Sequence, residues 1–166
     1  TEQGKVMVTY MKAEALQTVL AEQCVIGVPA PIALKIVRSL PTWKRDALSR
    51  VEFGPGTTAA FSTSEPAERF LGHGVWRVPV SGRSFSSMTN PTITFSGDIK
   101  RRHGGIVRVF ALGSESRALM TMSDGEALEM LTGDLIATLP DLRGKITDSA
   151  IWHWPLALST WLPGYI

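Results

Sequence analysis

The chain has 166 residues, of which 44% are hydrophobic and 19% charged, and its formal net charge is +2. This composition is typical of a globular domain, and no apolar run approaches the roughly 18 residues that a membrane-spanning helix needs. The charge surplus is small and no recognition helix or zinc-ligand spacing accompanies it, which argues against nucleic-acid binding. We therefore interpret the basic cluster at 100–103 as a solvated turn.

Cys24 is the only cysteine of the chain. A single cysteine excludes an internal disulfide and fits a reducing compartment, so a cytoplasmic location is predicted. Because its neighbours are apolar, we expect a packed and unreactive thiol.

The first forty residues predict a strand, a junction and a helix. Residues 5–11 are rich in β-formers, and residues 12–23 fit either a short helix or the second arm of a hairpin. Residues 24–28, "CVIGV", lack polar alternation, which is typical of a strand covered on both faces. Pro31 suits the first turn of the helix that follows, where a missing N–H costs nothing.

Next, Thr42 is predicted to be the N-cap of a second, short helix. Residues 51–62 predict a strand in which Gly54-Pro55-Gly56 forms a bulge or kink. Residues 64–70 fit one or two helical turns.

The second half of the chain predicts strands at 75–80, 92–96 and 106–112, separated by turn residues. Ser123 and Glu126 have the spacing of a capping box, and the apolar residues after them share one helical face as far as Leu139.

Residues 145–154 predict a last strand. Strands interspersed with helices in this order indicate an α+β fold, a mixed sheet with helices packed on it.

The residues that could carry chemistry are few. His73, His103 and His153 are dispersed, and no pair of them has metal-ligand spacing. No nucleophile elbow, P-loop or dinucleotide fingerprint is present, so neither a catalytic residue nor a metal site is predicted. Trp152 and Trp154 share one face of the last strand, with His153 on the other; they form either ordinary core or an aromatic wall for a flat ligand.

The order of these motifs, "CVIGVPAPIALKIV", "RVEFGPGTTAAF", "SDGEALEMLTGDLIATLP" and "IWHWPLALSTWLPG", resembles the middle-to-late part of flavin-containing amine oxidases and their protoporphyrinogen oxidase and desaturase relatives. Residues 21–31 match the strand by which such proteins leave the FAD-binding domain. The resemblance implies that residues 1–38 hold partial FAD-binding-domain strands and an exit helix, and that residues 39–166 form the substrate-binding domain.

By the same resemblance, the chain is a fragment of an FAD-dependent oxidoreductase that binds substrate and presents it to flavin N5 for hydride transfer. Its partners would be a small-molecule substrate, with an amine as one candidate, and the remaining FAD-binding segments; a homo-oligomer is one alternative for covering the exposed surface. The chain alone is expected to be inactive. The fragment interpretation also predicts exposed apolar surface at Val25 to Val28 and at Trp161.

The site residues are carried over in part. Thr58, Phe61, Trp152 and Trp154 are predicted to bind substrate; Val28, Pro29 and Trp154 are predicted to lie near the FAD cofactor.

Thr58 stands where many members have a lysine that assists reoxidation by oxygen, so the resemblance favours a dehydrogenase or desaturase over a rapid oxidase. No tyrosine stands at 157–159, the place of the first aromatic-cage residue, which argues against a simple monoamine. From the residues themselves, a free-standing α+β ligand-binding or protein-interaction module without redox chemistry remains the alternative.

Overall fold

The structure is a computed structural model that describes residues 4–92 and 104–160. The basic cluster at 100–103, Trp161 and most of the strand expected at 92–96 lie outside the described residues. The chain divides into two compact units, Thr1–Val51 and Glu52–Ile166, and each is described by itself.

A β-hairpin opens the first unit. Strand β1 (Val6–Lys12) pairs antiparallel with β2 (Ala15–Ala21), so residues 12–23 supply the second arm of a hairpin rather than a helix. The pairing of Lys12 with Ala15 leaves a two-residue turn. Both turn residues, Ala13 and Glu14, have positive φ (47° and 65°), as a turn that matches the twist of a hairpin requires.

Residues 24–28 form neither helix nor strand, so the strand expected there is not formed. A strand needs a hydrogen-bonded neighbour, and β1 and β2 pair only with each other. The predicted exposure of apolar residues is confirmed, since Val25 is 96% exposed and Val28 40%. Cys24 is exposed, so the prediction of a packed thiol is wrong.

Two short helices complete this unit: α1 (Ala30–Ile36), with a proline in its first turn as predicted, and α2 (Thr42–Ser49). The N-cap of α2 is Pro41 rather than Thr42, and no side chain caps it. The prediction for Thr42 is wrong because the extended ψ of Pro41 (148°) makes Thr42 the first helical residue.

The second unit contains a five-stranded antiparallel sheet. Its order is β4 (Arg77–Pro79), β5 (Ser87–Thr89), β6 (Gly105–Leu112), β3 (Phe53–Thr63) and β7 (Ile146–Ser159). The register of β3 against β7 shifts between Gly54 and Gly56, which confirms the predicted bulge. Helices and sheets together confirm the α+β fold class.

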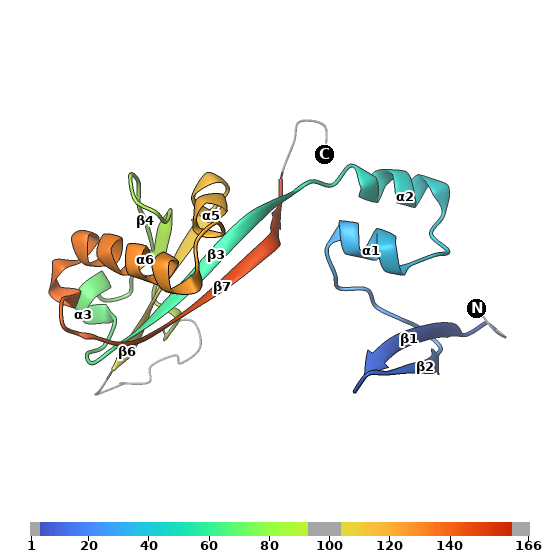
Figure 1. Cartoon of the computed structure of the whole chain (residues 1–166), viewed down its shortest axis with the longest axis horizontal. Helices are drawn as coiled ribbons and strands as arrows, with labels where there is room; N and C mark the ends of the chain where they lie inside the picture. Colours follow the sequence, from blue (N-terminus) through green and yellow to red (C-terminus); the bar gives the residue numbers. More distant parts are fainter. Residues whose placement is uncertain (1–3, 93–103, 161–166) are drawn as a thin grey trace. The chain divides into compact units, whose positions relative to one another are not determined.

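Helices cover one face of this sheet (Figure 1): α3 (Glu68–Leu71), α5 (Ser114–Leu119) and α6 (Asp124–Thr138), followed by the 3₁₀ turn η1 (Pro140–Leu142). None of the described helices is long and apolar enough to cross a membrane. The core lies between sheet and helices and consists mainly of the buried residues Ala59, Phe61, Phe85, Met88, Val107, Val109, Ala111, Leu119, Ala127, Leu131 and Leu135.

The other face of the sheet carries the site. Burial along β6 alternates residue by residue, because Val107 and Val109 point to the core while Arg108 and Phe110 point to the opposite face. Helices α3, α5 and α6 all lie on the core side, so we call this second face the open face.

Candidate functional site

Strand register groups the residues of the open face into rows. One row runs Arg77, Thr89, Arg108, Ala60 and Ala150 across the five strands, and the next runs Pro79, Ser87, Phe110, Thr58 and Trp152. A third joins Leu112, Gly56 and Trp154. The residues that β3 contributes are all small, and those of β6 and β7 beside them are mostly large.

A cavity of about 450 Å³ lies on this face. Its apolar and aromatic lining residues are Trp76, Phe110, Leu112, Trp154, Leu156 and Leu158; small or polar ones are Gly56, Thr58, Thr89, Ala157, Arg77 and Arg108. An apolar, aromatic cavity with a few polar groups is typical of a site for a small organic molecule.

Gly56 allows the two strands at one side of the cavity to approach each other. A Cβ atom at this position would lie 2.7 Å from the Cβ of Ala157 and 3.4 Å from Leu112 Cδ2. Gly56 lies at the bulge of β3 against β7. The lack of a side chain at Gly56 and the local twist of the bulge together allow Ala157 of β7 to lie close to β3.

Two arginines are held in place at this cavity. The Arg108 Nε donates to Thr89 Oγ1 at 3.3 Å, and its guanidinium lies 4.6 Å from the centroid of the Phe110 ring. The Arg77 Nη2 donates to Ser87 Oγ at 3.1 Å. Both hydroxyl partners are buried, which gives each guanidinium a fixed neighbour on the sheet.

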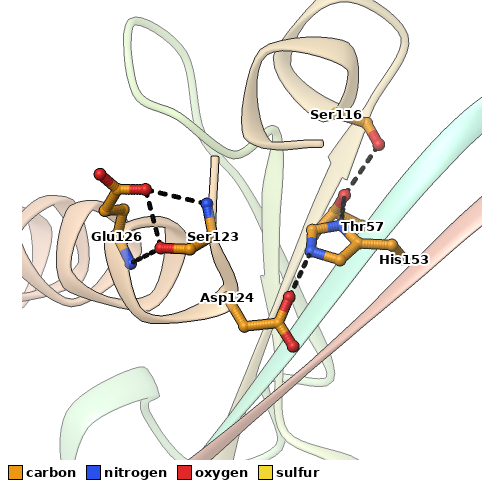
Figure 2. Close-up of polar contacts among 6 residues, drawn as sticks. All are labelled: Thr57, Ser116, Ser123, Asp124, Glu126 and His153. Carbon is orange, nitrogen blue, oxygen red and sulfur yellow. Dashed lines mark hydrogen bonds and ion pairs between the residues drawn. The ribbon is translucent and has the colours of Figure 1, made fainter. Parts of the chain in front are cut away.

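On the covered face, a buried polar network joins three elements (Figure 2). Thr57 Oγ1 is hydrogen-bonded to Ser116 Oγ at 2.9 Å and to His153 Nδ1 at 3.0 Å. His153 Nε2 lies 3.4 Å from Asp124 Oδ1 without hydrogen-bond alignment, and the contact becomes an ion pair only when the imidazole is protonated. Thr57 and Ser116 are fully buried, so these two hydroxyls tie sheet to helices and offer no surface to a substrate.

The structure brings some of the predicted site residues together. Thr58 and Trp154 both line the cavity, and Trp152 is the cross-strand partner of Thr58 on the same face, about half exposed and outside the lining set. Phe61 is fully buried in the core, because a residue three positions from Thr58 on a strand points to the opposite face.

Val28 and Pro29 belong to the first unit, where Val28 is exposed and Pro29 half-buried. Trp152 and Trp154 point away from His153, as the period of a strand predicts.

Sequence reasoning missed Trp76, Arg77 and Arg108. A signal was present for Arg108, since a lone arginine inside the apolar run "GIVRVFAL" must lie on the face opposite to the valines. Nothing in the sequence shows that Arg77 stands in the same row, because that depends on β5 lying between β4 and β6.

Comparison with known proteins gives one family. A family model described as flavin containing amine oxidoreductase matches residues 1–161. No curated protein matches the chain.

Solved structures share the fold. A protein from Exiguobacterium sp. 255-15 assigned as a protoporphyrinogen oxidase is 15% identical with a TM-score of 0.58, over 99% of this chain and 35% of its own. Wild-type putrescine oxidase bound to putrescine is 14% identical with a TM-score of 0.59, over 82% of this chain and 29% of its own. The chain thus spans about a third of the length of these structures.

Proposed function

Because this chain belongs to the family of flavin-containing amine oxidoreductases, we propose that its five-stranded sheet binds a small-molecule substrate and presents it to N5 of FAD for hydride transfer. The observation that carries this proposal is the aromatic cavity on the open face of the sheet. Thr58 and Trp154 contact the substrate, and Trp152 extends the aromatic surface beside them. Phe61 supports β3 from the core side.

The residues present fit one end of the cofactor. A flat isoalloxazine ring suits an apolar cavity with Trp154 at its wall, and Trp154 is our candidate for contact with both ring and substrate. The dinucleotide end needs backbone amides at a helix start after a glycine-rich turn. Gly54 and Gly56 lie inside strand β3, and neither of the longest described helices, α2 and α6, follows such a turn.

We therefore assign the dinucleotide part to other FAD-binding segments, which residues 1–38 join, while residues 39–166 form the substrate-binding domain. The exposure of Val25 and Val28 supports this assignment, because apolar side chains beside a proline junction suit a surface that other segments cover. A second copy of the chain is the alternative cover. The lone Cys24 supports a reducing, cytoplasmic setting.

When bound, flavin supplies the hydride acceptor. The chain's own residues orient the substrate and exclude water: the apolar walls remove water from the reacting C–H bond, and the fixed strands hold the substrate against the ring. Putrescine, the ligand of one related structure, is a diamine. The described residues that line this cavity include two arginines and no acidic residue, so a diamine of this kind is not the substrate we propose.

Binding of two fragments of FAD to the purified chain tests this assignment. Lumiflavin, the ring without its dinucleotide, should bind in equilibrium dialysis, whereas ADP should not. Trp154→Ala should weaken lumiflavin binding roughly three- to tenfold, as expected for loss of one aromatic contact. Trp43→Ala, which removes an exposed tryptophan of the first unit, is the matched control and should leave binding unchanged. Binding of ADP, or equal lumiflavin binding by the Trp154 variant, would show that the assignment is wrong.

A further inference from the structure

We propose that the substrate of this cavity carries an anionic group, a carboxylate or a group of the same charge and size, which Arg77 and Arg108 bind. The inference rests on the proposed function, because it names the substrate class of the same site. The first observation is the pairing of residues across three strands. Thr89 of β5 is the cross-strand partner of Arg77 on β4 and of Arg108 on β6. Two cations therefore flank one buried hydroxyl at one side of the cavity.

The charge of this pair is not matched within the described part of the chain. Arg77 and Arg108 take part in none of the ion pairs seen between described residues, and the side-chain hydrogen bonds of both arginines go to neutral hydroxyls. Among the described residues, no aspartate or glutamate lines the cavity. Arg77 and Arg108 stand on β4 and β6 with β5 between them, and two like charges at one cavity repel each other. An anion bound at the cavity would therefore stabilise this arrangement.

The arginines are also held ready for a ligand. Arg108 uses Nε for Thr89, and its guanidinium carbon lies over the Phe110 ring, which leaves the terminal Nη donors without a described partner. A guanidinium with fixed orientation and two free N–H groups binds a carboxylate in a paired, bidentate fashion. Held by its neighbours on the sheet, it loses little conformational freedom when the ligand arrives.

The remaining lining residues indicate what the anionic group is attached to. The rest of the cavity has an apolar surface. It is formed by Trp76, which directly precedes β4, by Trp154 on β7, and by the leucines of β6 and β7. The ligand that fits is thus an aromatic or otherwise apolar body with one negatively charged end. A compact cation would meet two like charges and no acidic partner.

Three probes of one shape test the proposal on the purified chain: 3-phenylpropionate, its neutral amide 3-phenylpropionamide, and the cation 3-phenylpropylamine. The carboxylate should bind about tenfold more tightly than the amide, as expected for a charge-assisted hydrogen bond, and the amine should bind most weakly. Added salt should reduce the advantage of the carboxylate and leave the amide unchanged.

Substitution of each arginine tests whether Arg77 and Arg108 cause the preference for the carboxylate. Arg108→Gln and Arg77→Gln should each reduce the preference for the carboxylate over the amide, and Arg108→Lys should keep part of it because the charge remains. Arg117→Gln, at an exposed arginine of α5 on the covered face, is the matched control and should keep all of it. Circular dichroism and thermal melting confirm that each variant is folded.

The outcomes separate this inference from the proposed function. If all three probes bind equally and Trp154→Ala weakens all of them, the cavity is a ligand site without anion recognition and only the present inference is wrong. If no probe binds, or if Trp154→Ala changes nothing, the cavity is not the ligand site and both proposals are wrong.

Discussion

Thr57 is the residue on which the covered face depends. Its single hydroxyl contacts Ser116 on α5 and His153 on β7, and all of this lies between the sheet and the helices. A buried hydroxyl without partners is destabilising, whereas a fully paired one fixes the elements that it joins. The network therefore fixes α5 and His153 of β7 against β3. The neighbours of His153, Trp152 and Trp154, point to the opposite face, where the cavity lies.

We expect Thr57→Val to destabilise the chain by about 1–3 kcal/mol, because Ser116 and His153 each lose a buried partner. The double variant Thr57→Val with Ser116→Ala should lose less than the sum of the two single changes, since it removes both ends of one hydrogen bond. Urea unfolding followed by tryptophan fluorescence measures both. Thr147→Val, the same exchange at an exposed threonine of β7, should change stability by less than about 0.5 kcal/mol. Strict additivity of the two changes would show that the hydroxyls act independently.

At the scale of the element, the start of α6 is fixed by local chemistry. Ser123 Oγ accepts from the Glu126 backbone N–H at 3.3 Å, and Glu126 Oε2 accepts from the Ser123 backbone N–H at 2.9 Å. The hydrogen bond from the Ser123 side chain, then that from its backbone, holds the pKa of the Glu126 carboxyl below its ordinary value. The contribution of a lowered carboxyl pKa to stability is present above the ordinary value of 4.5 and is lost as the pH falls through the lowered value.

Ser123→Ala should therefore cost about 1 kcal/mol at neutral pH through loss of the cap. In acid, where the Glu126 carboxylate of the unaltered chain is itself protonated, the cost should be smaller. Urea unfolding at a series of pH values, from neutral to well below 4.5, measures the difference. Ser81→Ala, at an exposed serine outside any helix or strand, should have no effect at any pH of the series. An equal cost of Ser123→Ala across the whole pH series would contradict a carboxylate role in the cap.

For the whole molecule, the two units differ in how much they bury. All members of the core cluster belong to the second unit, and among the described residues of the first only Ala30 and Ala33 are buried. The hairpin of the first unit exposes large apolar side chains, with Leu16 at 71%. A two-stranded hairpin without a packed face is marginally stable, so the first unit depends on contacts that it does not supply itself.

Hydrogen exchange should show this difference directly. Amides of β3, β6 and α6 should exchange slowly, with the protection of global unfolding, and amides of β1 and β2 close to the rate of an unstructured chain. The measurement is made by mass spectrometry at two protein concentrations. Protection of the hairpin only at the higher concentration would identify a second copy of the chain as its cover. Strong protection at both would contradict the marginal stability of the first unit.

The sequence alone determined whatever depends on neighbouring residues. The capping box at Ser123, the bulge at Gly54 to Gly56, the helix after Pro31 and the shared face of Trp152 and Trp154 all follow from backbone geometry within a few positions, and each is present in the structure. The order of these motifs also indicated the flavin-containing amine oxidoreductase family, which the family match confirms. That Thr58 and Trp154 would lie at one cavity came from the family resemblance rather than from spacing.

Only the tertiary structure decided which distant residues meet. Phe61 points into the core and Thr58 into the cavity because the helices cover one face of the sheet, which no local pattern specifies. Residues 24–28 have the composition of a buried strand, yet they form none, because a strand exists only through hydrogen bonds to a neighbour. Arg77 and Arg108 become one site because β5 pairs with both of their strands, and strand order is set by packing of the whole sheet.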